Sequence, residues 1–198
     1  MTAVACGADF WPSVGKWLSR PILNGGAPPE TYRKVHAAGN KVWVYNRPMS
    51  GVEMPEAHRR SYGLMLWKRG EDGVCNYAYQ HAFGASIYDD FDDVFYRDHV
   101  YAYPTVDGVI DTVQWEGVRE GVNDVRYLSI LLRAIEEAKS KQHAQNTARA
   151  AQAWLDSVDI EGDLQAVRHR MAQWIIQIER GIVRNVAVKG PSGRKERR

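Results

Sequence analysis

Eight polar and aromatic residues lie at or just beyond the C-terminal ends of predicted strands of this 198-residue chain. Trp and Tyr rings offer flat apolar surfaces for the C–H faces of a sugar ring, while Asp, Asn, Gln and Arg hydrogen-bond hydroxyl groups. Such a mixture at one edge of a parallel sheet predicts a pocket for a carbohydrate. The predicted substrate-binding residues are Asp9, Trp11, Asn24, Tyr45, Asn46, Arg47, Tyr79 and Gln80.

The sequence shows no pattern for a metal or another cofactor. The six histidines are scattered, and none pairs at a spacing of four residues on a helix. No zinc-type spacing of cysteines occurs, and we expect Cys6 and Cys75 to be buried free thiols, with a disulfide as the alternative. The acidic stretch 89–93 has the groups to bind a hydrated cation, but a solvated loop is the commoner outcome.

The first hundred residues alternate between strand and helix patterns. Short runs rich in β-branched and aromatic residues predict strands at 2–6, 21–24, 41–45 and 73–80. Helices are expected at about 29–38, opened by Pro28-Pro29, and at about 56–69, ended by Gly70. This alternation predicts an α/β fold with parallel strands, adjacent in chain order and with helices on one side.

Three helices are expected to close the chain, at about 112–139, at about 142–157 and after the N-cap Asp163. Apolar residues recur at three- and four-residue spacing along each, which predicts buried stripes. In the first helix the stripe is Trp115, Val118, Val122, Val125, Leu128, Leu132 and Ile135. In the second and third it is Ala144, Ala148, Ala151 and Leu155, then Leu164, Val167, Met171, Trp174 and Ile178.

The segment 101–128 combines a polar turn around Pro104 with a helix that carries a central glycine, Gly121. Glycine costs about 1 kcal/mol relative to alanine inside a helix, so we expect the helix backbone to pack closely against another element. The segment resembles the C-terminal signature of the glycoside hydrolase family 123 catalytic domain. The matching residues are Thr112, Val113, Glu116, Arg119, Gly121, Val122, Asp124, Tyr127 and Leu128, whereas Gln114 stands where Arg is usual and Thr105 where Gly is usual.

Other motifs extend this resemblance over roughly residues 9–128. They are a loop with Asp9, Trp11 and Pro12, a strand from Gly39 to Tyr45 with Trp43, Arg59 or Arg60 with Trp67 in a helix, and a strand from Gly73 to Tyr77. Trp43 and Tyr77 also suit a simple role as core aromatics.

The predicted fold class is α/β, as the C-terminal half of a (β/α)₈ TIM-type barrel, with four parallel βα units followed by additional C-terminal helices. A complete barrel usually needs about 250 residues, and four strands leave two open edges. The expected domains are a partial barrel at 1–140, a helical extension at 141–183 and a basic, disordered tail at 184–198. A free-standing half barrel that dimerises is the competing interpretation.

The resemblance implies a glycoside hydrolase similar to a β-N-acetylhexosaminidase, acting on N-acetylgalactosamine-like sugars. In that family an adjacent Asp and Glu are the catalytic pair, and no Asp-Glu dipeptide occurs in this sequence. We therefore expect the chain to contribute part of the sugar pocket and no catalytic residue, whether or not the whole protein is an enzyme. The alternative is a non-catalytic carbohydrate-binding or assembly fragment.

Glu116 and Arg119 are one turn apart, so we expect them to pair along the helix and to hold it to the barrel with Asp124. The alternative is that Glu116 reaches the pocket.

The charge and composition of the chain limit the kinds of partner that are expected. The basic excess lies in the last ten residues and leaves the remainder slightly acidic, which argues against nucleic-acid binding. No signal peptide or transmembrane span is visible, so the localisation is open and no membrane partner is expected. The expected partners are a carbohydrate and either an N-terminal barrel half or a homodimer mate.

Overall fold

The structure is a computed structural model that describes residues 2–6, 17–45, 48, 53–141 and 144–188. The chain forms two compact units, Met1–Val125 and Arg126–Arg198, whose boundary falls within helix α5 (Val113–Ala138). No helix in the described part of the chain is long and apolar enough to cross a membrane.

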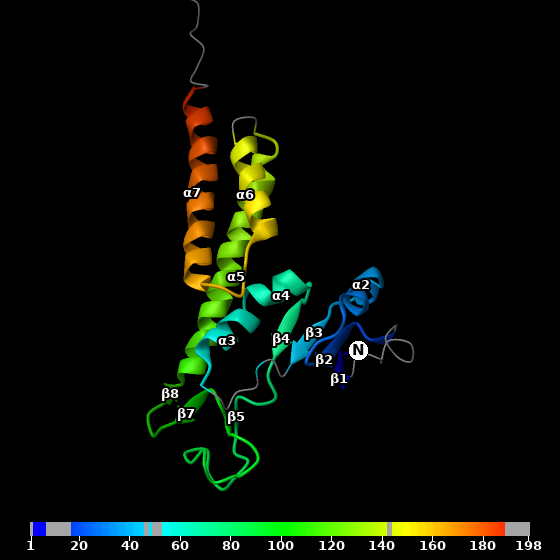
Figure 1. Ribbon diagram of the computed structural model, residues 1–198, viewed down its shortest axis with the longest axis vertical. Helices are drawn as coiled ribbons and strands as arrows, with labels where there is room; N and C mark the ends of the chain where they lie inside the picture. Colours follow the sequence, from blue (N-terminus) through cyan, green and yellow to red (C-terminus); the bar gives the residue numbers. More distant parts are fainter. Residues whose placement is uncertain (1, 7–16, 46–47, 49–52, 142–143, 189–198) are drawn as a thin grey trace, which may run out of the picture. The chain divides into compact units, whose positions relative to one another are not determined.

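The first unit is built on a four-stranded parallel sheet (Figure 1). Its strands are β1 (Thr2–Cys6), β2 (Arg20–Asn24), β3 (Trp43–Tyr45) and β4 (Gly73–Cys75), adjacent in the order β1-β2-β3-β4. Every neighbouring pair is parallel. The predicted direction and order of the four strands are therefore confirmed, and each strand lies within or beside its predicted range, although β3 and β4 are shorter than predicted.

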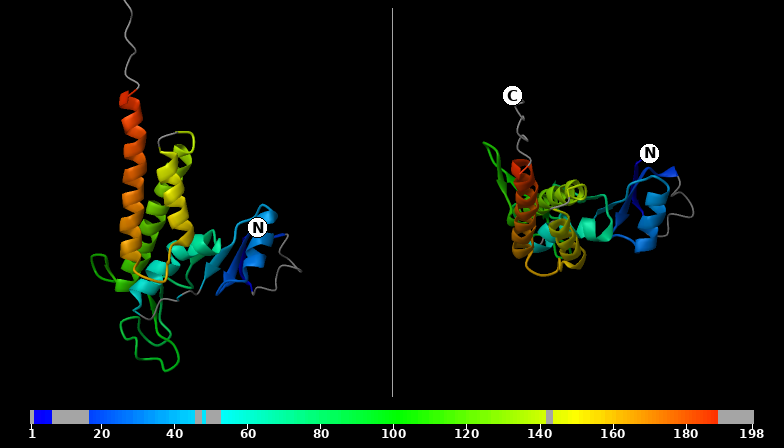
Figure 2. Two further views of the ribbon diagram at one scale, coloured as in Figure 1. Left: turned by 45° about the horizontal axis from the view of Figure 1, so that its top comes forward. Right: turned by 90° about the horizontal axis from the view of Figure 1, so that it is seen from above.

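One face of this sheet is packed by helices. In register, Leu23 of β2 lies beside Val44 of β3 and Val44 beside Val74 of β4. Tyr32 and Val35 of α2 (Pro29–Ala37) join this core, and Figure 2 shows α2 along the sheet in both views. Because side chains alternate along a strand, the core residues fall on one face.

The opposite face carries Ile22, Trp43, Tyr45 and Cys75, which are only partly buried. The Trp43 ring lies over Gly73, where a β-carbon would come within 2.6 Å of the indole, and Arg20 lies 5.2 Å from the Trp43 ring centroid. Trp43 thus packs on the sheet but is only half-buried and lies outside the buried core, and Tyr77 is 60% exposed, so neither is the core aromatic that the simpler interpretation expected. Cys75 is a free thiol, and burial raises its pKa.

The prediction of a single helix at about 56–69 is wrong. Two helices occur, α3 (Pro55–Ser61) and α4 (Leu64–Arg69), separated at Gly63, whose backbone has φ −120° and ψ −124°. A β-carbon on Gly63 would overlap the Arg59 carbonyl oxygen and lie 3.0 Å from the Gly121 Cα. The helix ends where the backbone of α5 crosses it.

The fourth strand is also shorter than the predicted 73–80. It ends at Cys75, and Gln80–His81 instead forms β5, antiparallel to β6 (His99–Val100). Asn76 turns the chain, since its Oδ1 accepts a hydrogen bond from the Tyr77 N–H at 2.7 Å. A second antiparallel pair follows, β7 (Ala102–Pro104) with β8 (Val109–Asp111).

Helix α5 packs on α3 through two glycines one turn apart, Gly117 and Gly121. A β-carbon on Gly117 would overlap the Pro55 carbonyl oxygen, and one on Gly121 would lie 2.5 Å from the Arg59 oxygen. The close approach expected at Gly121 is confirmed.

A buried ion pair fixes the same crossing. Arg59 donates from Nε to Asp124 Oδ2 at 2.7 Å and from Nη2 to Oδ1 at 3.2 Å. The Asp124 side chain is fully buried and that of Arg59 is 10% exposed. The expected Glu116–Arg119 pair also forms, with Arg119 Nε 2.7 Å from Glu116 Oε2, but on the surface. Asp124 with Arg59, therefore, holds α5 to α3.

The second unit contains the end of α5, α6 (Gln145–Ser157) and α7 (Leu164–Val188). Asp163 caps α7, with its Oδ1 accepting from Gln165 N–H at 2.8 Å and Ala166 N–H at 3.1 Å, as expected. The predicted stripe of α6 is buried, as is that of α7 apart from the half-buried Trp174.

Two details of the helix predictions are wrong. In α5, Val122 and Leu132 are exposed, and the buried stripe instead runs through Leu128, Leu131, Ala134, Ile135 and Ala138. With 3.6 residues per turn, position 132 falls to one side of the buried face that contains positions 128, 131 and 135. Residues 184–188, expected to belong to a disordered tail, are the end of α7, and the rest of that predicted tail lies outside the described residues.

Candidate functional site

The candidate site lies in the segments that follow strands β3 and β4. Glu53 belongs to the connection from β3 to α3, and the long segment from Asn76 to Thr112 leads from β4 to α5. In parallel α/β folds, ligand sites form from the segments that follow the carboxyl ends of the strands. These two connections are therefore placed where a site is expected.

A hydrogen-bonded group of side chains anchors the long segment to the end of β4. Asn76 Nδ2 donates to the Tyr101 hydroxyl at 2.6 Å and to the Pro48 carbonyl oxygen at 3.3 Å. Tyr101 in turn donates from its hydroxyl to the Tyr62 hydroxyl at 3.1 Å. The residue directly after β4 thus connects both segments that form the site.

The surroundings of this group are apolar, and its titratable members are neutral. Burial raises the pKa of Tyr101 and of Tyr62, and burial lowers the pKa of His58. The His58 ring lies against Tyr62 and Tyr101, and its Nδ1 is 2.9 Å from the Met54 carbonyl oxygen. We assign these residues a supporting role rather than acid–base chemistry.

A cavity of about 420 Å³ opens beside this anchor. Its lining combines carboxylates, one guanidinium group, aromatic rings and uncharged polar side chains. A volume in this range suits a small organic ligand. The lining residues are Glu53, Asp90, Phe91, Arg97, Asp98, Val100, Tyr103, Thr112 and Gln114.

Asp90 and Arg97 form the ordered rim of the cavity. Arg97 Nη1 lies 2.7 Å from Asp90 Oδ2, and its guanidinium carbon lies 4.4 Å from the Phe91 ring centroid. Asp90 Oδ1 accepts a hydrogen bond from the Asp98 N–H at 2.7 Å. Asp90 is thus occupied by protein groups, and its charge is balanced by Arg97.

Two buried acceptors at the cavity have no partner in the described part of the protein. Asp98 is 3% exposed, and its Oδ1 accepts from the Phe83 N–H at 2.9 Å, whereas its Oδ2 is unpaired. Gln114 is also 3% exposed, and its amide nitrogen donates to the Val100 carbonyl oxygen, which leaves Oε1 unpaired. Buried polar atoms are normally paired, and each exception calls for an explanation.

The negative charge of the cavity lining affects the pKa of Tyr103. Burial raises the pKa of Tyr103, and the carboxylates of Asp90, Glu53 and Asp98 raise it further. Its ring stacks on Tyr88 at a centroid distance of 5.9 Å. The phenol therefore stays protonated and offers a hydrogen-bond donor beside an aromatic face.

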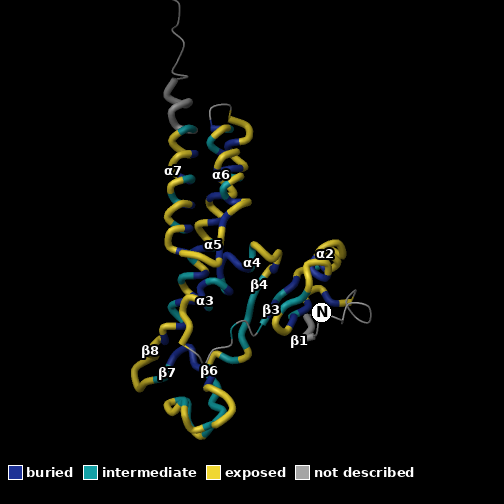
Figure 3. Tube along the Cα trace, in the orientation of Figure 1, coloured by how far each residue is buried: buried dark blue, intermediate teal, exposed yellow. Residues whose placement is uncertain are grey.

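The acidic loop between β5 and β6 uses its carboxylates to fold itself, and Figure 3 shows it as mostly exposed or half-buried. Asp92 Oδ2 accepts from the Ala85 and Ser86 N–H groups at 2.7 and 3.0 Å. Hydrogen bonds from the Tyr96 and Phe95 N–H groups lower the pKa of Asp93. Among the described residues, no three His, Cys, Asp or Glu side chains are grouped to hold a metal.

The four described residues of the predicted site, Asn24, Tyr45, Tyr79 and Gln80, do not line this cavity. Asn24 and Tyr45 are register partners at the carboxyl ends of β2 and β3, as expected. Tyr79 and Gln80 lie beyond the end of β4, where Tyr79 packs edge-on against Trp115 at 5.6 Å and Gln80 donates to the Ala102 carbonyl oxygen. Asp9, Trp11, Asn46 and Arg47 lie outside the described residues.

One position in the sequence points to the cavity residues that the prediction missed. Gln114 departs from the family signature, but nothing in its sequence neighbourhood connects it to a pocket. Asp98 and Tyr103 carried no local pattern, because their neighbourhood depends on the antiparallel pairing of β5 with β6 and of β7 with β8.

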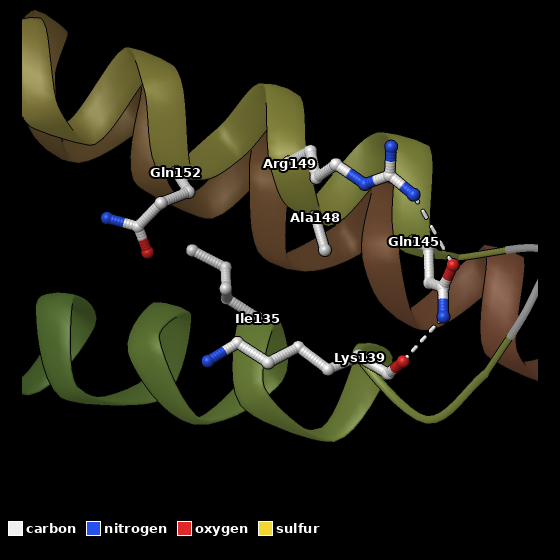
Figure 4. A pocket seen from close by; sticks show the side chains of 6 residues that line it. All are labelled: Ile135, Lys139, Gln145, Ala148, Arg149 and Gln152. Atoms are coloured by element: carbon white, nitrogen blue, oxygen red, sulfur yellow. Dashed lines mark hydrogen bonds between the residues drawn. The ribbon is translucent and has the colours of Figure 1, made fainter.

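A second cavity, of about 450 Å³, lies between α5 and α6 in the helical unit (Figure 4). Its polar lining is engaged, since Gln145 Nε2 donates to the Lys139 carbonyl oxygen at 2.6 Å and Arg149 Nη2 lies 3.5 Å from Gln145 Oε1. Ile135 and Ala148 supply its apolar floor. The described residues that line it include no carboxylate and no aromatic ring, so the cavity beside Asp98 is the stronger candidate.

Comparisons with protein-family models, with curated proteins and with solved structures found no match to this chain.

Proposed function

We propose that this chain is a segment of a glycoside hydrolase resembling a β-N-acetylhexosaminidase, and that it contributes a sugar pocket without the catalytic carboxylate pair. The observation that carries the proposal is the cavity formed by the connections that follow β3 and β4. It combines aromatic faces with several hydrogen-bonding groups, which is the composition that a sugar ring requires.

The parallel sheet supports the barrel interpretation. Four adjacent strands in chain order, with helices on one face, are what half of a (β/α)₈ barrel would present. The face with Ile22, Trp43 and Tyr45 would then line the barrel interior. The signature residues Gly121 and Asp124 support the resemblance because they have defined packing roles in α5.

The carboxylates of the cavity are better suited to binding than to hydrolysis. A glycosidase needs one carboxyl group that donates a proton and another that attacks, orients or activates. Asp90 is paired with Arg97, and Asp98 accepts a backbone hydrogen bond. The chain is therefore proposed to bind the sugar, while an Asp-Glu pair elsewhere would perform the chemistry.

The second candidate is a carbohydrate-binding or assembly fragment that pairs with a second copy. The observation that favours it is the half-buried sheet face with Ile22, Trp43, Tyr45 and Cys75. Parallel sheets are normally covered on both faces.

Titration of the full chain with monosaccharides and short oligosaccharides tests the proposal, with Phe91→Ala and Phe95→Ala as matched variants. The two rings are 80% and 83% exposed on the same loop, but only Phe91 lines the cavity. Loss of one stacking surface should weaken binding about three- to tenfold for Phe91→Ala, from an aromatic contribution of about 0.5–1.5 kcal/mol, and leave Phe95→Ala unchanged.

A chromogenic N-acetyl-β-galactosaminide provides the second readout, and we expect the chain alone not to turn it over. Turnover that Glu53→Gln removes would show that the cavity itself is catalytic. Equal effects of the two Phe variants, or no saccharide binding, would overturn the proposed sugar pocket.

A further inference from the structure

An exposed tyrosine ring lies directly beside the cavity. Tyr103 lines the cavity, and the ring of Tyr88 stacks on it with a centroid distance of 5.9 Å and an angle of 25° between the ring planes. Two nearly parallel rings at this distance are offset, so they form one stepped aromatic surface. Tyr88 is not among the residues that line the cavity, so this surface continues beyond it.

The second face of the Tyr88 ring is open to solvent. Tyr88 remains 65% exposed, although one of its faces is stacked on Tyr103. Phe91, which lines the cavity, is also well exposed. Grouped aromatic rings that stay in solvent beside a cavity commonly mark a binding surface.

Hydrogen bonds fix Tyr88 in this position. Its hydroxyl donates to the Pro104 carbonyl oxygen at 2.6 Å, and its backbone N–H donates to Ser86 Oγ at 3.2 Å. Asp92 holds the same turn, since its Oδ2 accepts from the Ala85 and Ser86 N–H groups. The ring is therefore held in place before any ligand arrives and would lose little conformational entropy on binding.

We propose that Tyr88 is the platform for a second sugar unit, so that the chain recognises a β-linked oligosaccharide rather than a single N-acetylhexosamine. This inference rests on the proposed function. The terminal unit lies in the cavity against Phe91 and Tyr103, and the next unit toward the reducing end stacks on the open face of Tyr88. The apolar C–H face of a pyranose ring suits this position, while the hydroxyl groups at its edge stay in water.

A saccharide fits this surface better than an apolar protein segment or a membrane. Asp89 and Asp90 separate Tyr88 from Phe91 in the sequence, and Asp89 is exposed. An apolar segment would remove this carboxylate from water, whereas a sugar hydroxyl can donate a hydrogen bond to it. The acidic stretch 89–93 is equally unsuited to an anionic membrane surface.

The test is calorimetric titration of the full chain with two ligands. One is the methyl β-glycoside of N-acetylgalactosamine, and the other is a β-linked disaccharide with N-acetylgalactosamine at its non-reducing end. The methyl glycoside keeps the linkage but lacks the second ring, so the difference in affinity isolates the second sugar unit. We expect the disaccharide to bind about three- to tenfold more tightly, as one aromatic stacking contact contributes.

Three variants test whether the Tyr88 ring supplies this gain. Tyr88→Ala should remove it and leave the affinity for the methyl glycoside unchanged. Tyr88→Phe, which keeps the ring but loses the hydrogen bond to Pro104, should retain most of it. The matched control is Phe95→Ala, at a ring of the same loop that is 83% exposed and outside the cavity lining, and it should change neither affinity.

The outcomes separate this inference from the proposed function. Equal affinities for the two ligands would show that the second unit makes no contact, and an equal loss for both ligands in Tyr88→Ala would show that Tyr88 only supports the cavity. Either result overturns the platform and leaves the sugar pocket in place. Binding of neither ligand overturns both.

Discussion

At the residue scale, the buried polar groups near the cavity divide into those that pair with one another and those that keep an unpaired atom among the described residues. Asn76, Tyr101 and Tyr62 satisfy one another and connect β4 to the segments that follow it. Asp98 and Gln114 each keep one acceptor unpaired beside the cavity. This difference cannot be read from the sequence, since Asn76 and Gln114 are equally able to play either part.

His58 makes the stability of the chain depend on pH. Burial lowers its pKa in the folded state, so below a pH of about 6.5, the ordinary value, the unfolded chain takes up a proton that the folded chain does not. The free energy of unfolding should therefore fall as the pH drops from 7.5 to 5.5. In urea denaturation at the two pH values, His58→Gln should show a smaller difference than the wild type.

The matched control is His36→Gln, at a side chain that is 40% exposed and lies 2.8 Å from Asp72. Burial also lowers the pKa of His99, so some pH dependence should remain in His58→Gln. An unchanged pH dependence in His58→Gln would show that His58 is not the group responsible.

At the element scale, the crossing of α5 over α3 depends on two glycines. Gly117→Ala and Gly121→Ala each place a β-carbon against a backbone carbonyl oxygen, and overpacking of this kind costs about 1–3 kcal/mol. Gly108→Ala, where a β-carbon meets nothing within 4 Å, is the control. Chemical denaturation should show a large loss for the first two variants and little change for the third.

The buried Arg59–Asp124 pair should matter more than the exposed Glu116–Arg119 pair. Removing one partner of a buried pair leaves an uncompensated charge, at a cost of about 3–5 kcal/mol, whereas an exposed pair contributes about 0.2–1 kcal/mol. We expect Arg59→Ala to lower the melting temperature strongly and Arg119→Ala to change it slightly. The reverse order would assign the structural role to the surface pair.

At the scale of the whole molecule, the sequence was informative where local pattern decides structure. The strand patterns at 2–6, 21–24, 41–45 and 73–80 were enough to predict a parallel sheet and the order of its strands. Alternating strands and helices can connect into only a few sheet topologies. The break between α3 and α4 at Gly63 was not predicted, because it depends on contact with the distant Gly121. The early end of β4 was not predicted either, because Asn76 after it pairs with the distant Tyr101. The cavity was not predicted for the same reason, because its lining comes from residues that are distant in sequence.

The half-buried face of the sheet permits a test of the assembly alternative. If a second copy covers Trp43 and Tyr45, the chain should sediment as a dimer, and Tyr45→Lys should convert it to a monomer by placing a charge in the interface. A wild-type monomer at high micromolar concentration would remove the dimer and favour a barrel completed by another segment.

The central claim, that the cavity beside Asp98 is a sugar site, is tested most directly by amide chemical-shift mapping of the full chain during saccharide titration. The account predicts saturable shifts concentrated at residues 90–98 and 100–114, with little change at Asn24 and Tyr45 or around Lys139 and Arg149. Shifts centred on the sheet edge or on the helical unit, or none at all, would contradict it.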